Sequence, residues 1–191
     1  MAGRSTGFLA SRFLERRVPL RGKITRELAS CCIARLLVLA TEDRHRPVIT
    51  YIDSPGGSAA DALAIISTMN GIRSPVVTFC RGPIGAAAAV IAAHGLKGFR
   101  TADAAAHFSL RLQPDFSRDG HSDTHESYLK LLAQTLAQDT GNAEAQVLRW
   151  LSEGAEFNAQ EAIRNGLIDA IGREPLLPKQ GPPPPTHKPT G

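Results

Sequence analysis

Residues 48–57 read Val-Ile-Thr-Tyr-Ile-Asp-Ser-Pro-Gly-Gly, and this stretch decides the fold of the chain. Its first five residues are β-branched or aromatic and follow Pro47, a pattern that predicts a strand ending in the Asp-Ser-Pro turn. Glycine at positions 56 and 57 lets the backbone adopt positive φ and lets another group approach the main chain closely. Residues 59–69 are rich in helix formers with apolar side chains at helical spacing, so we expect a helix after the glycines.

A second unit of the same kind follows along the chain. Residues 76–80 read V-V-T-F-C after Pro75 and predict a strand, the segment from Gly82 to Ala87 predicts a turn, and residues 86–93 predict a buried helix of small residues. Strands that alternate with helices form right-handed parallel crossovers, and their functional groups gather at the carboxyl ends of the strands. We therefore expect the two glycine turns to form one site, at helix N-termini that favour negative charge.

Five motifs in the same order resemble the proteolytic subunit of the Clp protease. Y-I-D-S-P-G-G at residues 51–57 is similar to that family's Y-I-N-S-P-G-G, and G-P-I-G-A-A-A-A at residues 82–89 takes the place of its G-Q-A-A-S-M-G-A. The likeness continues in G-L-K-G-F-R at residues 95–100, in the segment from Thr140 to Ala162, and in G-L-I-D at residues 166–169. The resemblance covers about residues 13–169 and implies an α/β single-domain fold, the ClpP/crotonase-like spiral of repeated β-β-α units.

The same resemblance places the family's catalytic serine, histidine and aspartate at positions that hold other residues here. The serine position is Ala86, the histidine position is Arg111, and the aspartate position is Gly154. Placing the gap one residue differently gives Leu112 in place of Arg111. Alanine has no nucleophilic atom, a guanidinium stays protonated at neutral pH, and glycine has no carboxylate. The resemblance thus implies a subunit in which no member of the triad is intact.

We still expect the part of the active site that is built from backbone groups, which is the oxyanion hole. The resemblance assigns the oxyanion hole to the N–H groups of Gly57 and Ala87, which are main-chain groups and do not depend on the triad side chains. Two interpretations stay open at this point: the turns serve only as structure, or they keep an acyl-binding role. Neither the residues nor the resemblance calls for a cofactor or a metal.

A replacement nucleophile would have to come from another part of the chain. Cys80 lies on the predicted strand before the Gly82 turn, where we expect it to be buried. Ser109 and His107 share one face of the strand predicted to reach Arg111, because alternate residues point the same way. A serine and a histidine spaced along one strand do not meet as nucleophile and base, so we expect neither to replace the triad.

The composition is that of an ordinary globular protein with one domain. The 191 residues are 42% hydrophobic and 21% charged, and no apolar run reaches the length of a membrane span or the pattern of a secretory signal. Three cysteines without disulfide or metal spacing predict a reducing cytoplasm. The net charge of +4 comes from scattered basic residues without aromatic partners, so we expect neither nucleic acid nor a membrane as a partner.

The chain divides into three parts by composition and resemblance. Residues 1–12 form a short N-terminal segment, residues 13–173 the ClpP-like domain, and residues 174–191 a Pro-rich disordered tail. Apolar stripes and caps predict helices at residues 26–40, 122–138, 142–153 and 159–165, and a closing strand at residues 167–171. Residues 113–122 predict an exposed loop. We interpret the set His121, Asp123, His125 and Glu126 beside it as solvent-exposed rather than as a metal site.

Three functions are compatible with the sequence. The first is a non-catalytic subunit in a homo- or hetero-oligomeric ring of Clp-type subunits, with an AAA+ unfoldase as a further partner, although the family's N-terminal loop and handle segment are both shorter here. The second is a weakly active or unconventional serine-type peptidase that uses the retained oxyanion hole. The third is a crotonase-like acyl-CoA binding protein, which needs an acid or base; the carboxylate nearest to the glycine turns is that of Asp61. We expect Asp61 to interact with the helix dipole or to lie at the surface.

Overall fold

The computed structural model describes residues 16–112 and 122–172, with the backbone alone for residues 122–124. The short N-terminal segment, the loop at 113–121 and the Pro-rich tail lie outside these residues, and so do the predictions made for them.

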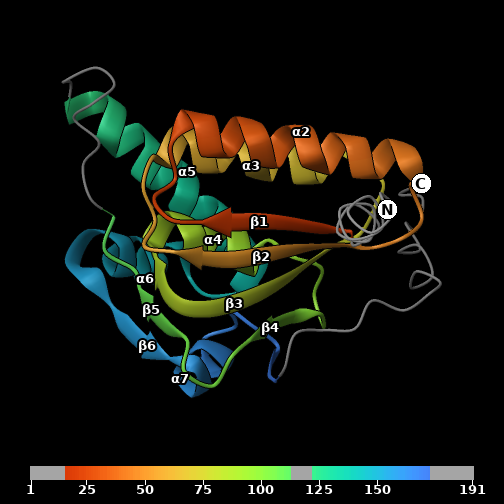
Figure 1. Ribbon diagram of the computed structural model, residues 1–191. Coiled ribbons are helices and arrows are strands. Elements are labelled where there is room, and N and C mark those ends of the chain that lie inside the picture. Colours follow the sequence, from red (N-terminus) through yellow and green to blue (C-terminus); the bar gives the residue numbers. More distant parts are fainter. Residues whose placement is uncertain (1–15, 113–121, 173–191) are drawn as a thin grey trace, which may run out of the picture.

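Five parallel strands form the centre of the molecule (Figure 1). In sheet order they are β1 (Arg17–Arg21), β2 (Val48–Ser54), β3 (Val76–Gly85), β4 (Arg100–Ala102) and β7 (Ala170–Ile171). A short branch leaves the end of β3, where β5 (His107–Ser109) pairs in parallel with Pro83 to Gly85 and β6 (Glu156–Asn158) pairs antiparallel with β5. The two strands predicted on either side of the first glycine turn are confirmed, and so is their parallel pairing.

Seven helices accompany the strands among the described residues, and the predicted Thr25 cap is among their N-caps. The helices are α2 (Arg26–Glu42), α3 (Ala59–Gly71), α4 (Ala86–Ala93), α5 (Ser122–Thr140), α6 (Glu144–Arg149), the π-helix η1 (Trp150–Gly154) and α7 (Ala159–Arg164). Thr25 caps α2 by accepting a hydrogen bond from the Leu28 N–H, as predicted, and Ser58 caps α3 in the same way. Helices α2 and α3 lie side by side over one face of the sheet (Figure 1).

The main core lies between the sheet and the helices, and α4 fills its middle. Every residue of α4 is at most 3% exposed, since the helix contacts β3 on one side and α3 and α5 on the others. Its alanine-rich sequence lets these neighbours approach closely, because small side chains keep the helix narrow. Along β2, Val48 and Ile52 point into this core, whereas Ile49 and Tyr51 point to the opposite face of the sheet.

Four predicted elements differ from the structure. The closing strand predicted over residues 167–171 covers only Ala170–Ile171, because its pairing with β4 begins at Ala170. Strand β3 runs past Cys80 to Gly85, because its last residues gain a new partner in β5. The strand predicted to reach Arg111 ends at Ser109. The helix predicted over residues 142–153 is divided into α6 and η1. The Leu112 N–H donates to the Leu151 carbonyl, and the Leu110 N–H donates to the Ala155 carbonyl. Carbonyl groups in and beside the π-helix are thus hydrogen bonded by a neighbouring segment of the chain.

A buried ion pair joins the end of the fold to its centre. The Arg100 guanidinium lies 2.6 Å from Asp169 Oδ1, and the side chains are 3% and 19% exposed. Arg100 Nη1 also donates to the carbonyl oxygens of Ala93 in α4 and Asp139 in α5. Burial opposes ionisation of Asp169, but hydrogen bonds from the Arg100 side chain and backbone outweigh it and hold the pKa of Asp169 below its ordinary value. One polar group thus ties α4, α5, β4 and the turn before β7 together.

The outer edge of β1 is chemically closed. Pro19 in its middle has no N–H to offer, and the Cys32 thiol donates to the Pro19 carbonyl. Arg35 Nε donates to the Arg17 carbonyl on the same edge. Strand β1 has β2 as its sheet neighbour, and side chains of α2 occupy backbone acceptors on the other side.

Within residues 16–112 and 122–172, no helix is long and apolar enough to cross a membrane.

Candidate active site

The two glycine turns meet, as the sequence predicts. A Cβ atom built on Gly85 would lie 1.9 Å from the Pro55 carbonyl oxygen and 2.8 Å from the Gly56 nitrogen. A Cβ on Gly56 would in turn lie 3.4 Å from the Gly85 carbonyl carbon. The Pro55–Gly56 peptide therefore packs directly against Gly85, and only glycine at position 85 permits this contact.

Gly57 is fixed by the segment that follows β1. The Ile24 N–H donates to the Gly56 carbonyl at 2.8 Å, and the Ser58 N–H donates to the Ile24 carbonyl at 3.0 Å. Successive residues of an extended segment point their backbone groups to opposite sides. The Gly57 N–H therefore points away from Ile24 and stays available to another acceptor.

Helix α4 begins directly at the contact between the turns. Ala86 is its first residue and Ala87 its second, and the Gly85 cap makes no side-chain hydrogen bond to them. The first N–H groups of a helix have no partner within the helix and carry a partial positive charge. The Ala87 N–H is therefore suited to bind a carbonyl oxygen or an anion. Ala86 presents only a methyl group at the same place and is 3% exposed.

The structure also brings together Arg111 and Gly154, the positions that the resemblance assigns to the histidine and the aspartate. A Cβ on Gly154 would lie 3.2 Å from both Cβ and Nε of Arg111. Arg111 donates from Nη2 to the Glu153 carbonyl at 2.7 Å and from Nε to the same oxygen at 3.2 Å. The guanidinium is thus held by a main-chain oxygen. Leu112, the alternative position, points into the core and is 6% exposed.

Cys80 cannot supply a replacement nucleophile. Its side chain is fully buried in the core below α4, as the sequence predicts. Burial strongly raises the pKa of the thiol, because the thiolate would have no water around it.

Ser109 and His107 share one face of β5, as predicted, but both bind Glu156 on the neighbouring strand. Ser109 Oγ donates to Glu156 Oε1 at 2.8 Å, and His107 Nε2 contacts Glu156 Oε2. Hydrogen bonds from Ser109 and His107 lower the pKa of the Glu156 carboxyl. The serine therefore faces a weakly basic carboxylate instead of the histidine, and the set lacks the order nucleophile, imidazole, carboxylate. Sequence reasoning missed Glu156, which comes from β6.

Asp61 lies in the first turn of α3, where a carboxylate suits the helix dipole. The prediction of a surface position for it is wrong, because the residue is only 8% exposed. Its backbone N–H donates to Ser58 Oγ at 3.2 Å, which is the N-cap bond of α3.

Among the described residues, no group of three or more histidine, cysteine, aspartate or glutamate side chains could hold a metal ion. His121 and the side chain of Asp123 lie outside those residues. Nothing in the described part of the site calls for a cofactor.

The comparison with protein families gives one match over most of the chain. The model of the Clp protease family matches residues 3–175. This range includes both glycine turns, α4, and the Arg111–Gly154 contact.

Curated relatives carry names from the same family. The chain is 33% identical over 177 residues to the ATP-dependent Clp protease proteolytic subunit-related protein 2, chloroplastic, of Arabidopsis thaliana, covering 89% of this chain and 63% of that protein. It is 34% identical over 169 residues to the ATP-dependent Clp protease proteolytic subunit 3 of Frankia casuarinae, covering 84% of this chain and 79% of that protein. The chain thus spans less than two thirds of the length of the plant relative.

The fold is shared with a solved member of the family. The crystal structure of the ClpP protease catalytic domain from Plasmodium falciparum superposes with a TM-score of 0.78 and 26% identity, over 92% of this chain and 95% of that one. The α/β single-domain fold expected from the motifs is therefore confirmed. Together with the family model and the identity to curated relatives, this shows that the chain belongs to the Clp protease family.

Proposed function

We propose that this chain is a non-catalytic subunit of a Clp-type proteolytic ring, in which it contributes structure or regulation while other subunits cleave peptides. The observation that carries the proposal is the start of α4, where Ala86 places a methyl group beside two well-formed backbone turns. A methyl group cannot attack a carbonyl, whatever surrounds it.

The other two positions support the same conclusion. Arg111 and Gly154 are in contact, as a histidine and its orienting aspartate would be in a triad. Here the pair consists of a permanently protonated guanidinium and a residue without a side chain. The guanidinium is engaged by the Glu153 carbonyl, so it neither accepts a proton nor needs a carboxylate partner.

The backbone donors of Gly57 and Ala87 form the part of an active site that this chain keeps. In serine proteases, an oxyanion hole and substrate binding without a working triad still leave about 10³–10⁴-fold catalysis over water. That is several orders of magnitude below a protease with its triad. We assign the turns a role in fixing α4 against β2 and leave them no role in turnover.

Exposed apolar side chains support assembly with other subunits. Leu37 and Val38 lie on the solvent side of α2 and are 48% and 56% exposed. Adjacent exposed residues of this size mark a surface that another subunit can cover. Partners for it are further copies of this chain or active Clp-type subunits, and action beside an AAA+ unfoldase belongs to the same proposal. The three cysteines are free thiols, which supports a reducing compartment such as the cytoplasm.

Hydrolysis of fluorogenic peptides, together with labelling by a serine-reactive fluorophosphonate, tests the lack of activity. We expect the purified wild-type protein to show neither turnover nor label above a heat-denatured sample. The Ala86→Ser variant places a hydroxyl at the start of α4 and reports whether the backbone turns alone can activate it; we expect little or no label, because position 111 offers no base. Turnover by the wild-type protein would contradict the proposal and would require another nucleophile.

Co-purification with an active Clp-type subunit tests the assembly. We expect mixed oligomers in native mass spectrometry, and we expect Leu37→Asp with Val38→Asp to dissociate them while the chain stays folded. Gln160→Asp on the exposed side of α7 serves as the matched control and should leave assembly unchanged. A chain that stays monomeric beside every active relative tried, at concentrations where those relatives assemble, would overturn the ring proposal.

A further inference from the structure

A histidine joins three helices at the end of α4. His94 is the C-cap of that helix, and its ring contacts both α3 and α5. His94 Nδ1 lies 2.7 Å from Asp139 Oδ2 in α5, and Nε2 lies 2.9 Å from Asn70 Oδ1 in α3. The His94 and Asp139 side chains are 15% and 21% exposed. We call these three residues the His94 bridge.

Both ring nitrogens of His94 face oxygen atoms. A neutral imidazole carries one N–H and donates to one acceptor, whereas an imidazolium carries two and donates to both. The Asp139 carboxylate only accepts hydrogen bonds, and the Asn70 amide presents its oxygen to the ring. Both contacts of the bridge are therefore hydrogen bonds only when the imidazole is protonated on both nitrogens.

Arg100 is a second cation beside the bridge, and its charge is already compensated. Its Nη1 donates to carbonyl oxygens at the ends of α4 and α5, and the guanidinium is paired with Asp169. From β3, the Thr78 hydroxyl donates to the Ala92 carbonyl and brings no charge. The last carbonyls of a helix carry a partial negative charge that favours a cation. The surroundings of His94 at the end of α4 thus suit a positively charged ring.

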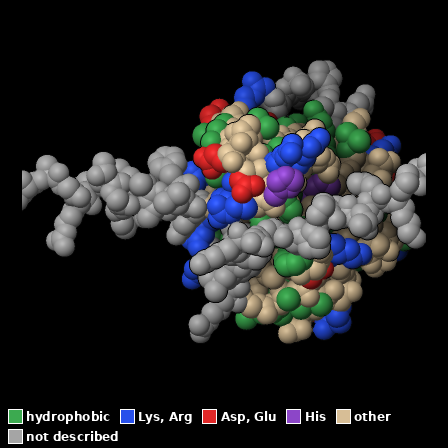
Figure 2. Space-filling view, turned by 90° about the vertical axis from the view of Figure 1, so that its right-hand side faces the viewer, with side chains coloured by type: hydrophobic (Ala, Val, Ile, Leu, Met, Phe, Trp, Pro, Cys, Tyr) green, Lys and Arg blue, Asp and Glu red, His purple; other side chains and the backbone are tan. Residues whose placement is uncertain are grey.

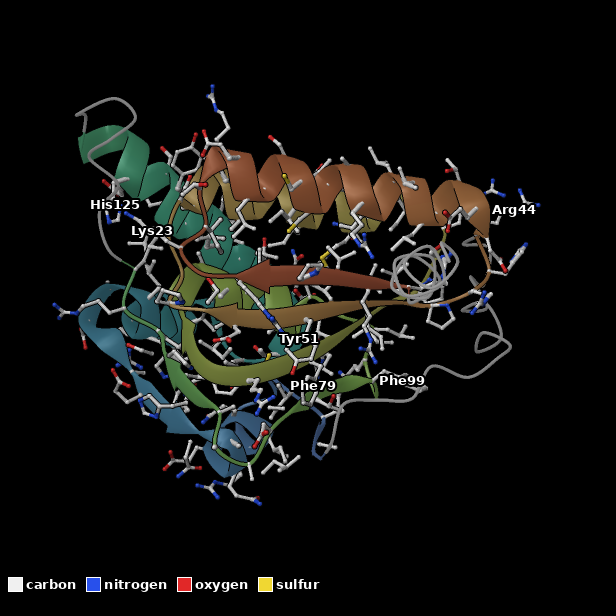
Figure 3. The ribbon with its side chains drawn as sticks, viewed as in Figure 1. Lys23, Arg44, Tyr51, Phe79, Phe99 and His125 are labelled. Carbon is white, nitrogen blue, oxygen red and sulfur yellow. The ribbon has the colours of Figure 1, made fainter. Side chains whose placement is uncertain are left out.

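The bridge lies at the end of the molecule opposite to the glycine turns. The Leu96 N–H donates to the Val76 carbonyl at 2.7 Å, which places the segment after His94 at the amino end of β3. In Figure 3 the amino ends of β2 and β3 lie on the side of Arg44, and both strands run away from it toward the turns.

Other charged and titratable groups on the elements around α4 lie in water or farther away. The residues that follow α2, α3 and α4 along the chain are exposed; they are Arg44, Arg73 and Lys97. Those of β2, β5 and the first turn of α3 lie at the end of the glycine turns; they are Asp53, His107 and Asp61. On α5, Lys130 lies about two and a half turns before Asp139.

Helices α3 and α4 are thus connected at both of their ends. At their first residues the glycine turns meet, and close packing of Gly85 against the Pro55–Gly56 peptide holds that contact at any pH. At their last residues Asn70, one residue before the end of α3, meets His94, which directly follows α4. This second contact depends on a proton.

We propose that the His94 bridge is a proton-dependent latch, closed when the imidazole is doubly protonated and open toward α3 when it is neutral. Loss of the Nε2 proton leaves a lone pair facing the Asn70 oxygen, so attraction becomes repulsion. The Nδ1–H keeps its bond to Asp139, and α5 stays attached to α4. The end of α3 therefore loosens as the pH rises through the range in which histidines titrate, about pH 5 to 8. The latch concerns one chain and does not depend on the proposed function.

Hydrogen–deuterium exchange of the full-length protein at pH 6 and pH 8, corrected for the intrinsic pH dependence of exchange, tests the latch. In the wild-type protein we expect the protection of amides 68–72, at the end of α3, to be about fivefold to tenfold lower at pH 8. Amides 59–63, at the start of the same helix, are the internal reference and should keep their protection. Equal protection of amides 68–72 at both pH values would overturn the proposal, because the Asn70 amide would then turn over and donate to a neutral ring.

Three variants identify the group that titrates. His94→Gln replaces the ring by a side chain that does not titrate, and Asn70→Ala removes the acceptor at an exposed position of α3. We expect the protection of amides 68–72 to be independent of pH in both. His107→Gln removes an exposed histidine beside Glu156 and is the matched control, which should keep the wild-type response. A pH response that survives in His94→Gln or Asn70→Ala, or that disappears in His107→Gln, would overturn the proposal. If His94→Gln does not fold, Asn70→Ala decides alone.

Discussion

The backbone half and the side-chain half of the candidate active site differ in what the fold demands of them. At Gly85 the neighbouring peptide leaves no room for even one more carbon atom. At Arg111 the side chain lies at the surface, and its hydrogen bonds go to a single main-chain oxygen. Close packing thus fixes the turns, whereas the positions that would carry chemistry can vary at little cost to the fold. Motifs set by packing therefore identify the family far better than they identify an activity.

The strongest way to break this contrast is a methyl group at Gly85. In Gly85→Ala the new carbon would lie 1.9 Å from the Pro55 carbonyl oxygen, so β2 and α4 must move apart. We expect a loss of roughly 3–5 kcal/mol in the free energy of unfolding, measured by urea denaturation.

Gly71→Ala is the matched control for this change. Nothing lies within 4 Å of a Cβ built on Gly71 at the end of α3, and the new side chain reduces the entropy of the unfolded chain. We expect no loss, or a gain of up to about 1 kcal/mol. Similar stability of the two variants would show that the turns are not held by packing.

Removing one charge of the buried Arg100–Asp169 pair should have the next largest effect on the free energy of unfolding. Asp169→Asn removes the charged partner of Arg100, whose side chain is 3% exposed. Taking one partner from such a pair leaves an uncompensated charge, and we expect a loss of about 3 kcal/mol. Thermal unfolding of the variant beside the wild-type protein measures it. A loss below that of an exposed ion-pair variant such as Glu126→Gln would contradict this ranking.

The same pair predicts the response to acid. The pKa of Asp169 is lowered in the folded protein, so its ionisation stabilises the fold at pH values above about 4, the ordinary value of an aspartate. This contribution disappears as the pH falls through the lowered pKa. We expect the stability difference between wild type and Asp169→Asn to be full at pH 7 and to shrink below pH 4. A difference that stays constant from pH 7 to pH 3 would exclude a role for the charge.

Rebuilding the carboxylate position should have a smaller cost. Gly154 has φ +91, a backbone conformation that costs a residue with a Cβ about 1–2 kcal/mol. Gly154→Asp adds contact with Arg111, whereas Gly22→Asp places the same change at φ +82 with nothing within 4 Å. We expect the first variant to be less stable than the second in parallel denaturation curves, and Arg111→Ala to remove most of the difference. Equal stability of the two aspartate variants would mean that the 111–154 contact is not tight.

Arg111→Ala should have the smallest effect of all. The side chain is exposed, and its partner oxygen can bind water instead. We expect a change within about 0.5 kcal/mol, as measured by urea denaturation. A loss comparable to that of Asp169→Asn would show that the guanidinium supports the fold, which would erase the contrast between the two halves of the site.

Local patterns explain most of the fold. The run at residues 48–52, the Thr25 cap and the alanine-rich helix lie where the sequence indicates, because each depends on neighbours in the chain. The π-helix was beyond prediction, since its geometry depends on N–H groups of Leu110 and Leu112, which lie far away in sequence. Strand β3 was predicted too short for the same reason: its last residues pair with β5.

The candidate site shows the same limit. The meeting of the two turns followed from parallel topology. The shared face of His107 and Ser109 followed from the alternation of side chains along a strand. Glu156 decides what that pair does, yet it reaches them from a strand of three residues with no distinctive pattern. Assigning roles to side chains therefore required knowing which strands pair, and this information is not local.

Figure 2 shows basic and acidic side chains mixed on the face turned toward the viewer, which is a surface suited to staying dissolved. The closed edge of β1 also protects the chain from aggregation, but through its backbone hydrogen bonds. An open edge of a parallel sheet can recruit the next chain without limit, strand upon strand, and the product is a fibre. With Pro19 and the α2 side chains occupying that edge, growth in that direction is blocked. Assembly at this edge must then use side-chain surfaces, which can form a closed complex with a fixed number of subunits.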